Sequence, residues 1–170
     1  DILKFSFQDL EDNHHYIQWL FPTDRKSNFN SKSELLTNED IEQFKSNKQL
    51  RENFIKSLKI ILDFYRIHLH IDKDNMYRFI LKYWNDISPR VRDHDFDWCN
   101  SKEIKNWITT KNHNFLRISR ILRSCRLILG QEFAESLFNF LVQHFWLQFH
   151  EIIGIETLKY WREAVFDLTF

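Results

Sequence analysis

The chain has 170 residues, of which 43% are apolar and 28% charged, and its 24 basic side chains balance its 24 acidic ones. This length and composition predict one soluble globular domain with a sizeable core and exclude a disordered or fibrous chain. With only 2 Gly and 2 Pro, the chain lacks the turn residues of an all-β fold or a phosphate-binding glycine loop, and the balanced charge argues against a globally basic nucleic-acid binder.

The two cysteines, Cys99 and Cys125, are too few for a disulfide framework, and neither lies in a spacing typical of zinc sites. We therefore expect an intracellular protein, cytoplasmic or nuclear, without a metal or another cofactor. No run of about 20 apolar residues occurs, so no membrane-spanning helix is predicted. Because the chain begins at Asp1 rather than Met, we expect it to be a piece of a longer protein.

Apolar residues recur at intervals of three and four along most of the chain, which predicts helices. The expected helices cover residues 9–20, a short segment starting at Thr37 or Asn38, 48–67, 75–85, a short segment from 101 to about 110, 112–129, 131–150 and 156–168. Connectors are expected at 23–33, 68–74 and 90–100. The fold class predicted for residues 1–170 is a single compact all-α domain of about six to eight helices, without a significant sheet.

Residues 112–129 give the clearest helical pattern. Apolar residues follow one face of it, and Gly130 stands where a glycine commonly ends a helix. The face comprises Phe115, Ile118, Leu122, Cys125 and Leu129.

Four blocks and one residue pair resemble the conserved domain of the opioid growth factor receptor family. They are LEDNHHYIQWLFP at 10–22, LLTNEDIEQF at 35–44, ILDFYRIHL at 61–69, HNFLRISRIL at 113–122 and Tyr160-Trp161. Together they cover about residues 9–161 in the family's order. This chain differs from the pattern at His15, where the family favours Asp, at Arg66, where it has Gly, and in a longer stretch between Leu69 and His113.

The resemblance implies a helical domain whose animal namesake binds the pentapeptide Met-enkephalin and restrains cell proliferation. That namesake is located around the nucleus and associates with membranes without spanning them. By the same resemblance we expect a noncatalytic receptor-like domain that binds a peptide or protein partner, with peripheral membrane association and perinuclear location as further expectations.

The block at 10–22 places polar and aromatic residues at one helix end, and we interpret it as one wall of a cleft that recognises an aromatic or peptide ligand. The residues of this wall are His14, His15, Tyr16, Gln18 and Trp19. The alternative is a structural helix end, in which Trp19 and Phe21 fill the core and one histidine binds a carbonyl. A metal site is not favoured, because adjacent histidines on a helix cannot face one ion.

The block at 113–122 lies in a locally basic stretch. No acidic residue occurs between Glu103 and Glu132, whereas six cations do: Lys105, Lys111, Arg117, Arg120, Arg123 and Arg126. Helical spacing predicts Arg117 and Arg126 at the edges of the apolar face and Arg120 and Arg123 pointing outward. This side could be a solvated face with some ion pairs, an anion site formed with His113 and Asn114, or, as the alternative function, a nucleic-acid patch.

The blocks at 10–22 and 113–122 each combine an apolar face with polar residues that are costly to bury alone. We therefore expect the blocks to form a shared cleft that brings His14, Gln18 and Trp19 near His113, Arg117 and Arg120. No catalytic motif is found, so an enzyme is not expected and ranks third among the functions.

Overall fold

The structure is a computed structural model that describes residues 4–26, 34–74, 76–81 and 102–167. It is mostly helical, which confirms the predicted fold class. The helices are α1 (Phe7–Asp12), α2 (Tyr16–Leu20), α3 (Asn38–Ser46), α4 (Lys48–Phe64), α6 (Lys102–Trp107), α7 (Asn114–Leu129), α8 (Gln131–Leu141), the π-helical turn η3 (Val142–Trp146), α9 (Leu147–Ile153) and α10 (Ile155–Phe166). The strands β1 (Ile67–Ile71) and β2 (Tyr77–Leu81) follow α4.

Polar side chains cap the N-termini of α1, α3 and α4. The Thr37 hydroxyl accepts a hydrogen bond from the Asp40 backbone N–H at 3.2 Å, and the Asp40 carboxylate accepts one from the Thr37 N–H at 2.9 Å. This reciprocal pair satisfies backbone donors that a helix leaves free. Asn47 caps α4 through the Leu50 N–H. Helices α3 and α4 thus both begin where the sequence predicts.

The single helix expected over residues 9–20 is wrong, because the chain forms two short helices there. Helix α1 ends at Asp12 and α2 begins at Tyr16. The Asn13 side chain accepts the His15 N–H at 2.9 Å, a local bond that competes with helix continuation. The break turns the C-terminal carbonyls of α1 toward α7.

The connector expected at 68–74 and the helix expected at 75–85 are also wrong, because β1 and β2 form an antiparallel hairpin. Ile67 and Leu69 alternate with more exposed histidines, a period of two that predicts a strand. The Asp72 carboxylate closes the turn by accepting the backbone N–H of Met76 at 2.9 Å. Arg66 has a left-handed φ of 63°, a conformation that favours glycine and ends α4 before the expected residue 67.

In the C-terminal half, α7 and α10 lie within two residues of their predicted ranges. The continuous helix expected at 131–150 is instead α8, η3 and α9, with a non-helical Phe149. Gly130 and Gly154 have φ of 104° and 79° and separate consecutive helices. The expectations for Cys99 and for residues 82–101 lie outside the described residues.

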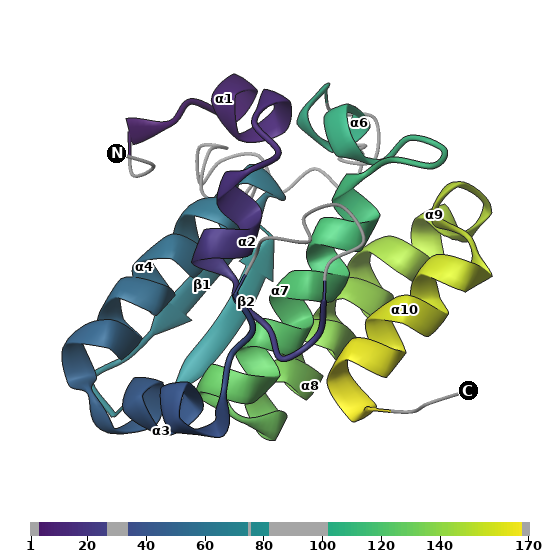
Figure 1. Cartoon of the computed structure of the whole chain (residues 1–170). Coiled ribbons are helices and arrows are strands. Elements are labelled where there is room, and N and C mark those ends of the chain that lie inside the picture. The colour runs from purple at the N-terminus through teal and green to yellow at the C-terminus, as the bar shows by residue number, and fades with distance from the viewer. Residues whose placement is uncertain (1–3, 27–33, 75, 82–101, 168–170) are drawn as a thin grey trace.

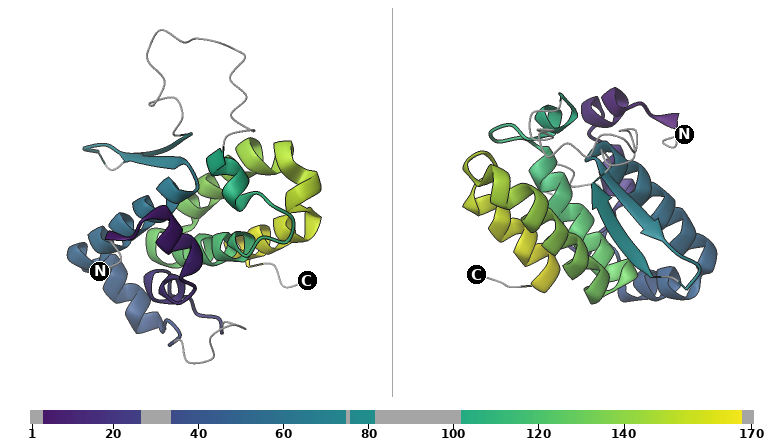
Figure 2. Two further views of the ribbon diagram at one scale, coloured as in Figure 1. Left: turned by 90° about the horizontal axis from the view of Figure 1, so that it is seen from above. Right: turned by 180° about the vertical axis from the view of Figure 1, so that it is seen from behind.

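Helix α7 lies in the middle of the domain, with α8 and α10 packed along one side and α4 on the other (Figure 1). Figure 2 shows the hairpin from behind, alongside α4. Tyr77 and Phe79 of β2 pack on Phe133 of α8, with ring centroids 4.6 and 5.4 Å apart. Trp107 and Trp161 are the largest fully buried side chains of the described core.

Candidate functional site

The blocks at 10–22 and 113–122 meet at one buried side chain, Arg117 of α7, which is 5% exposed. Its Nη1 donates to the Leu10 carbonyl at 2.8 Å, and its Nη2 donates to the carbonyls of Glu11 and Asn13 at 3.2 and 3.1 Å. The last carbonyls of a helix have no partner inside it, and a cation is favourable there. Arg117 therefore fastens the turn between α1 and α2 to α7.

A buried polar network surrounds this guanidinium. Asn114 donates to a Glu11 carboxylate oxygen at 2.9 Å and accepts from the Tyr65 hydroxyl at 3.0 Å. The Tyr16 hydroxyl donates to the carbonyl that also accepts from Nη1 of Arg117, and the Tyr16 ring centroid lies 5.6 Å from the guanidinium carbon. Burial raises the pKa of Tyr16 to about 12, so its hydroxyl remains a donor.

His14 and His113, one from each block, border this network with ring centroids 4.7 Å apart. His113 Nε2 lies 3.4 Å from a Glu11 carboxylate oxygen, and Arg117 Nη2 lies 3.4 Å from His14 Nδ1. Burial, with the adjacent Arg117, holds the pKa of His113 below its usual 6.5 in spite of Glu11. The folded protein therefore favours a neutral His113 near neutral pH.

This lowered pKa predicts a loss of stability in mild acid. Below about pH 6.5 the unfolded chain binds a proton at residue 113 more readily than the folded chain does, so the free energy of unfolding falls as the pH drops toward the folded pKa. Because the ring is partly solvated, we expect less than about 1 kcal/mol from it. Urea unfolding between about pH 7.5 and 5 should show this loss in the wild type and a smaller one in His113→Gln. His144, whose pKa is also lowered by burial, calls for a parallel His144→Gln series. An unchanged pH profile in His113→Gln would contradict the assignment.

The other residues of the first block do not reach this junction. His15 is exposed just before α2, and Gln18 and Trp19 line a separate hollow of about 200 Å³ beside α3. The expectation that Trp19 fills the core in a structural helix end is wrong, because it is 71% exposed whereas Phe21 is fully buried. The structure thus brings His14 together with His113, Asn114 and Arg117, and leaves Gln18 and Trp19 apart.

Most arginines of the basic face predicted for α7 bind other groups of the same domain. The expectation that Arg123 points outward is wrong: it is 7% exposed, and its Nη2 donates to Asp24 at 2.7 Å. Arg120, also expected outward, is half-buried, and its Nε donates to the Phe21 carbonyl at 2.8 Å. Both arginines lie on the side of α7 that helical spacing predicts. They are not exposed because the segment after α2 covers this side.

Three carboxylates form ion pairs with most of the nearby arginines. Asp167 accepts from Arg123 at 3.0 Å and from Arg25 at 2.6 Å, and it lies 3.5 Å from Arg126. Arg25 also donates to Glu163, and Asp24 pairs with Arg123. Hydrogen bonds from Arg123 hold the pKa values of both aspartates below their usual range. This ion-pair network joins the segment after α2 to α7 and to the end of α10.

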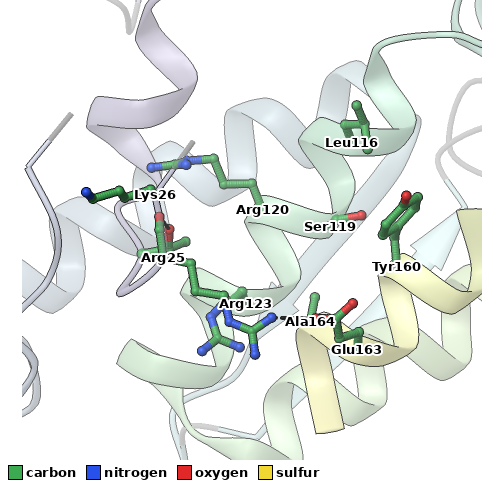
Figure 3. Close-up of a pocket in the computed structure, with 10 residues that line it drawn as sticks. Arg25, Lys26, Leu116, Ser119, Arg120, Arg123, Tyr160, Glu163 and Ala164 are labelled. Carbon is green, nitrogen blue, oxygen red and sulfur yellow. Dashed lines mark hydrogen bonds and ion pairs between the residues drawn. The ribbon is translucent and has the colours of Figure 1, made fainter. Parts of the chain in front are cut away.

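A groove of about 440 Å³ opens beside this network, between the segment after α2, α7 and α10 (Figure 3). In Figure 3, Arg120 and Lys26 extend to one side of the groove, and Tyr160 of α10 lies on the other side. Tyr160 and Leu116 are 51% and 46% exposed. The volume of the groove lies within the range typical of ligand sites, and the lining of the groove combines apolar and cationic groups. The lining residues are Thr23, Arg25, Lys26, Leu116, Ser119, Arg120, Arg123, Tyr160, Glu163 and Ala164.

The sequence alone singled out only Arg120 and Arg123 of this groove. A signal for Tyr160 exists in the Tyr160-Trp161 pair, because adjacent residues of a helix point in different directions and Trp161 is fully buried. Leu116 could have been found as an apolar residue outside the buried face of α7. Arg25 and Lys26 lie in an irregular segment whose position no periodicity predicts.

Neither a cluster of metal ligands nor a membrane-spanning helix occurs in the described part of the chain. In residues 4–26, 34–74, 76–81 and 102–167 no group of three or more His, Cys, Asp or Glu side chains is arranged to hold a metal ion. No helix within these ranges has the length and apolar character needed to cross a membrane.

The described residues form a mostly helical domain with one β-hairpin, and sequence comparison identifies the family. The model of the opioid growth factor receptor conserved region matches residues 3–168. The chain therefore belongs to the opioid growth factor receptor family.

Curated relatives agree with this assignment. The chain is similar to opioid growth factor receptor-like protein 1 of Xenopus tropicalis, with 33% identity over 82% of this chain and 23% of the relative. It is 32% identical to the opioid growth factor receptors of Rattus norvegicus and Homo sapiens, over 83% and 79% of this chain and 22% and 17% of those proteins. The chain thus spans about a fifth of the length of the relatives it matches. No solved structure matches it.

Proposed function

We propose that this domain is a noncatalytic interaction module that binds a short segment of a peptide or protein partner in the groove between α7 and α10. The observation that carries the proposal is the pairing of exposed Leu116 and Tyr160 with free space of about 440 Å³. Tyrosine is common at binding surfaces, because its ring supplies contact area and its hydroxyl remains in water. The names of the relatives, opioid growth factor receptor and opioid growth factor receptor-like protein 1, are in keeping with ligand binding.

The chemistry of the described residues supports the noncatalytic part of the proposal. Cys125 is fully buried, and burial raises the pKa of its thiol far above the usual range, so it does not supply a reactive thiolate. Of the predicted cleft, Arg117 and Asn114 are buried in contacts that hold the fold together. The part of α7 that remains open to a partner is the side that carries Leu116 and Arg120.

Truncation of the apolar side of the groove tests the proposal. Short random peptides displayed on phage are selected on the wild-type domain, and the enriched peptides, together with Met-enkephalin, are titrated by calorimetry. We expect Leu116→Ala with Tyr160→Ala to weaken the selected peptides by about tenfold or more, because exposed aromatic anchors carry much of the energy of an interface. Both side chains are half exposed, so the domain should keep its cooperative unfolding.

The matched control is Trp19→Ala with Leu147→Ala, which removes similar side chains that are 71% and 58% exposed outside the groove. These changes should leave the affinity within about twofold. Peptides that bind the groove variant as well as the wild type would contradict the proposal. So would a loss of affinity confined to the control pair.

A further inference from the structure

The groove has cations that its acidic groups do not neutralise. Arg25 and Arg123 each bind carboxylates, and these carboxylates belong to Asp24, Glu163 and Asp167. Within the described ranges no ion pair to a carboxylate is recorded for Arg120 or Lys26. The sequence from 27 to 33, which follows Lys26, contains no Asp or Glu. Among the described residues, one end of the groove therefore carries positive charge that no carboxylate pairs.

Arg120 is the more informative of the two, because it is half-buried. Its one hydrogen bond within the described residues runs from Nε to the Phe21 carbonyl at 2.8 Å. That bond fixes the plane of the guanidinium and leaves the four Nη protons for another acceptor. Burial lowers the pKa of Arg120 from its usual value, so its charge is partly desolvated. A partly desolvated cation without an anion is costly, and an anion removes that cost.

The neighbours of Arg120 specify what accompanies the anion. Leu116 lies one helical turn before Arg120 on α7, and Tyr160 faces the same groove from α10 (Figure 3). Both present apolar surface beside the cationic end. A ligand that fills the groove therefore needs an oxyanion at one end and an apolar or aromatic group next to it.

We propose that Arg120 and Lys26 bind an oxyanion of the partner peptide, a carboxylate or a phosphoryl group, while an adjacent apolar side chain of that peptide lies against Leu116 and Tyr160. The proposal rests on the groove being the peptide site and adds its charge preference. The planar guanidinium offers two parallel donors to either oxyanion, and the Lys26 ammonium adds a point charge.

Small matched probes test this charge preference directly. N-acetylphenylalanine carries an aromatic ring and a carboxylate, N-acetylphenylalaninamide is its neutral counterpart, and phenyl phosphate carries the phosphoryl group. Each is titrated into the domain at constant ionic strength and followed by NMR, with the Nε–H signal of Arg120 as the local reporter. We expect the carboxylate to bind about tenfold more tightly than the amide, because charge-assisted hydrogen bonds are about twice as strong as neutral ones. The ratio of carboxylate to phosphate affinity identifies the source of the oxyanion.

Three variants locate the site. Arg120→Gln should remove the preference for acid over amide, and Lys26→Gln should reduce it by about two- to fivefold. Lys26 is exposed, so Lys26→Gln should leave the fold intact. It therefore still tests the site if Arg120→Gln destabilises the domain. Arg162→Gln is the control, because Arg162 is an exposed arginine of α10 outside the groove lining, and it should change nothing.

The results separate this inference from the function on which it rests. Equal binding of acid and amide would overturn the anion site and leave the groove as a peptide site. Absence of binding by all three probes would also overturn the anion site. The titrations with phage-selected peptides would then be the test of the groove as a peptide site. Submicromolar, salt-sensitive binding of a DNA or RNA duplex that Arg120→Gln abolishes would assign the cations to nucleic-acid phosphates instead.

Discussion

Replacement of Arg117 by Ala is expected to lower the free energy of unfolding by about 3–5 kcal/mol, because it leaves several buried polar groups without a partner. The carbonyls of Glu11 and Asn13 lose the Arg117 donor, the Leu10 carbonyl keeps only the Tyr16 hydroxyl, and Asn114 loses a neighbour 3.3 Å away. Urea unfolding followed by far-UV circular dichroism measures the loss.

Two further variants show what this loss depends on. Arg117→Lys keeps the charge but lacks the planar fork that serves three carbonyls, so it should recover only part of the stability. Arg162→Ala removes an exposed arginine and should change stability by less than about 0.5 kcal/mol. A cost below about 1 kcal/mol for Arg117→Ala would contradict its role as the fastening between α1 and α7.

Trp161→Ala is expected to cost about 3–5 kcal/mol, as the removal of a large buried ring does. The Trp161 side chain is fully buried, and its Nε1 donates to the Phe115 carbonyl at 2.9 Å. It therefore joins α10 to α7 by packing and by one hydrogen bond. Chemical unfolding monitored by circular dichroism gives the value without relying on tryptophan fluorescence.

The same change at another tryptophan supplies the comparison. Trp19→Ala should alter stability by less than about 0.5 kcal/mol, because 71% of that residue is exposed. Trp161→Phe keeps most of the ring volume but loses the Nε1 donor, so we expect a loss of about 1–2 kcal/mol. Similar costs for Trp19→Ala and Trp161→Ala would show that the two tryptophans are not placed as described.

Helices with strong local signals could be predicted from the sequence. The apolar face of α7 repeats every three or four residues, and Thr37 and Asn47 supply caps within a few residues of the backbone they bind. Such signals depend only on residues that are close in the chain, so a single sequence is enough to recognise them. The hairpin was misread because the apolar residues of 67–81 fit both helical and strand spacing in so short a stretch.

The roles of the arginines could not be predicted, because their partners are remote in sequence. Asp24 is 99 residues from Arg123, and the Leu10 carbonyl is 107 residues from Arg117. Helical periodicity indicates only which side of α7 an arginine occupies. Whether that side meets water or another segment depends on the path of the chain after α2. The candidate groove was missed for the same reason, since two of its walls come from opposite ends of the chain.

The hydrogen bonds from α7 to the segment before and after α2 also determine where this domain has to begin. Arg117, Arg120 and Ser124 all bind backbone carbonyls of residues 10–22, across about a hundred residues of chain. Closing a loop of that length costs about 4 kcal/mol of chain entropy, which these bonds and the burial of Phe21 offset. A shortened chain that starts after residue 22 keeps all of α7 and loses every one of these acceptors. The N-terminal boundary of the folding unit therefore lies before α1, although α1 and α2 together supply few of the residues in the hydrophobic core.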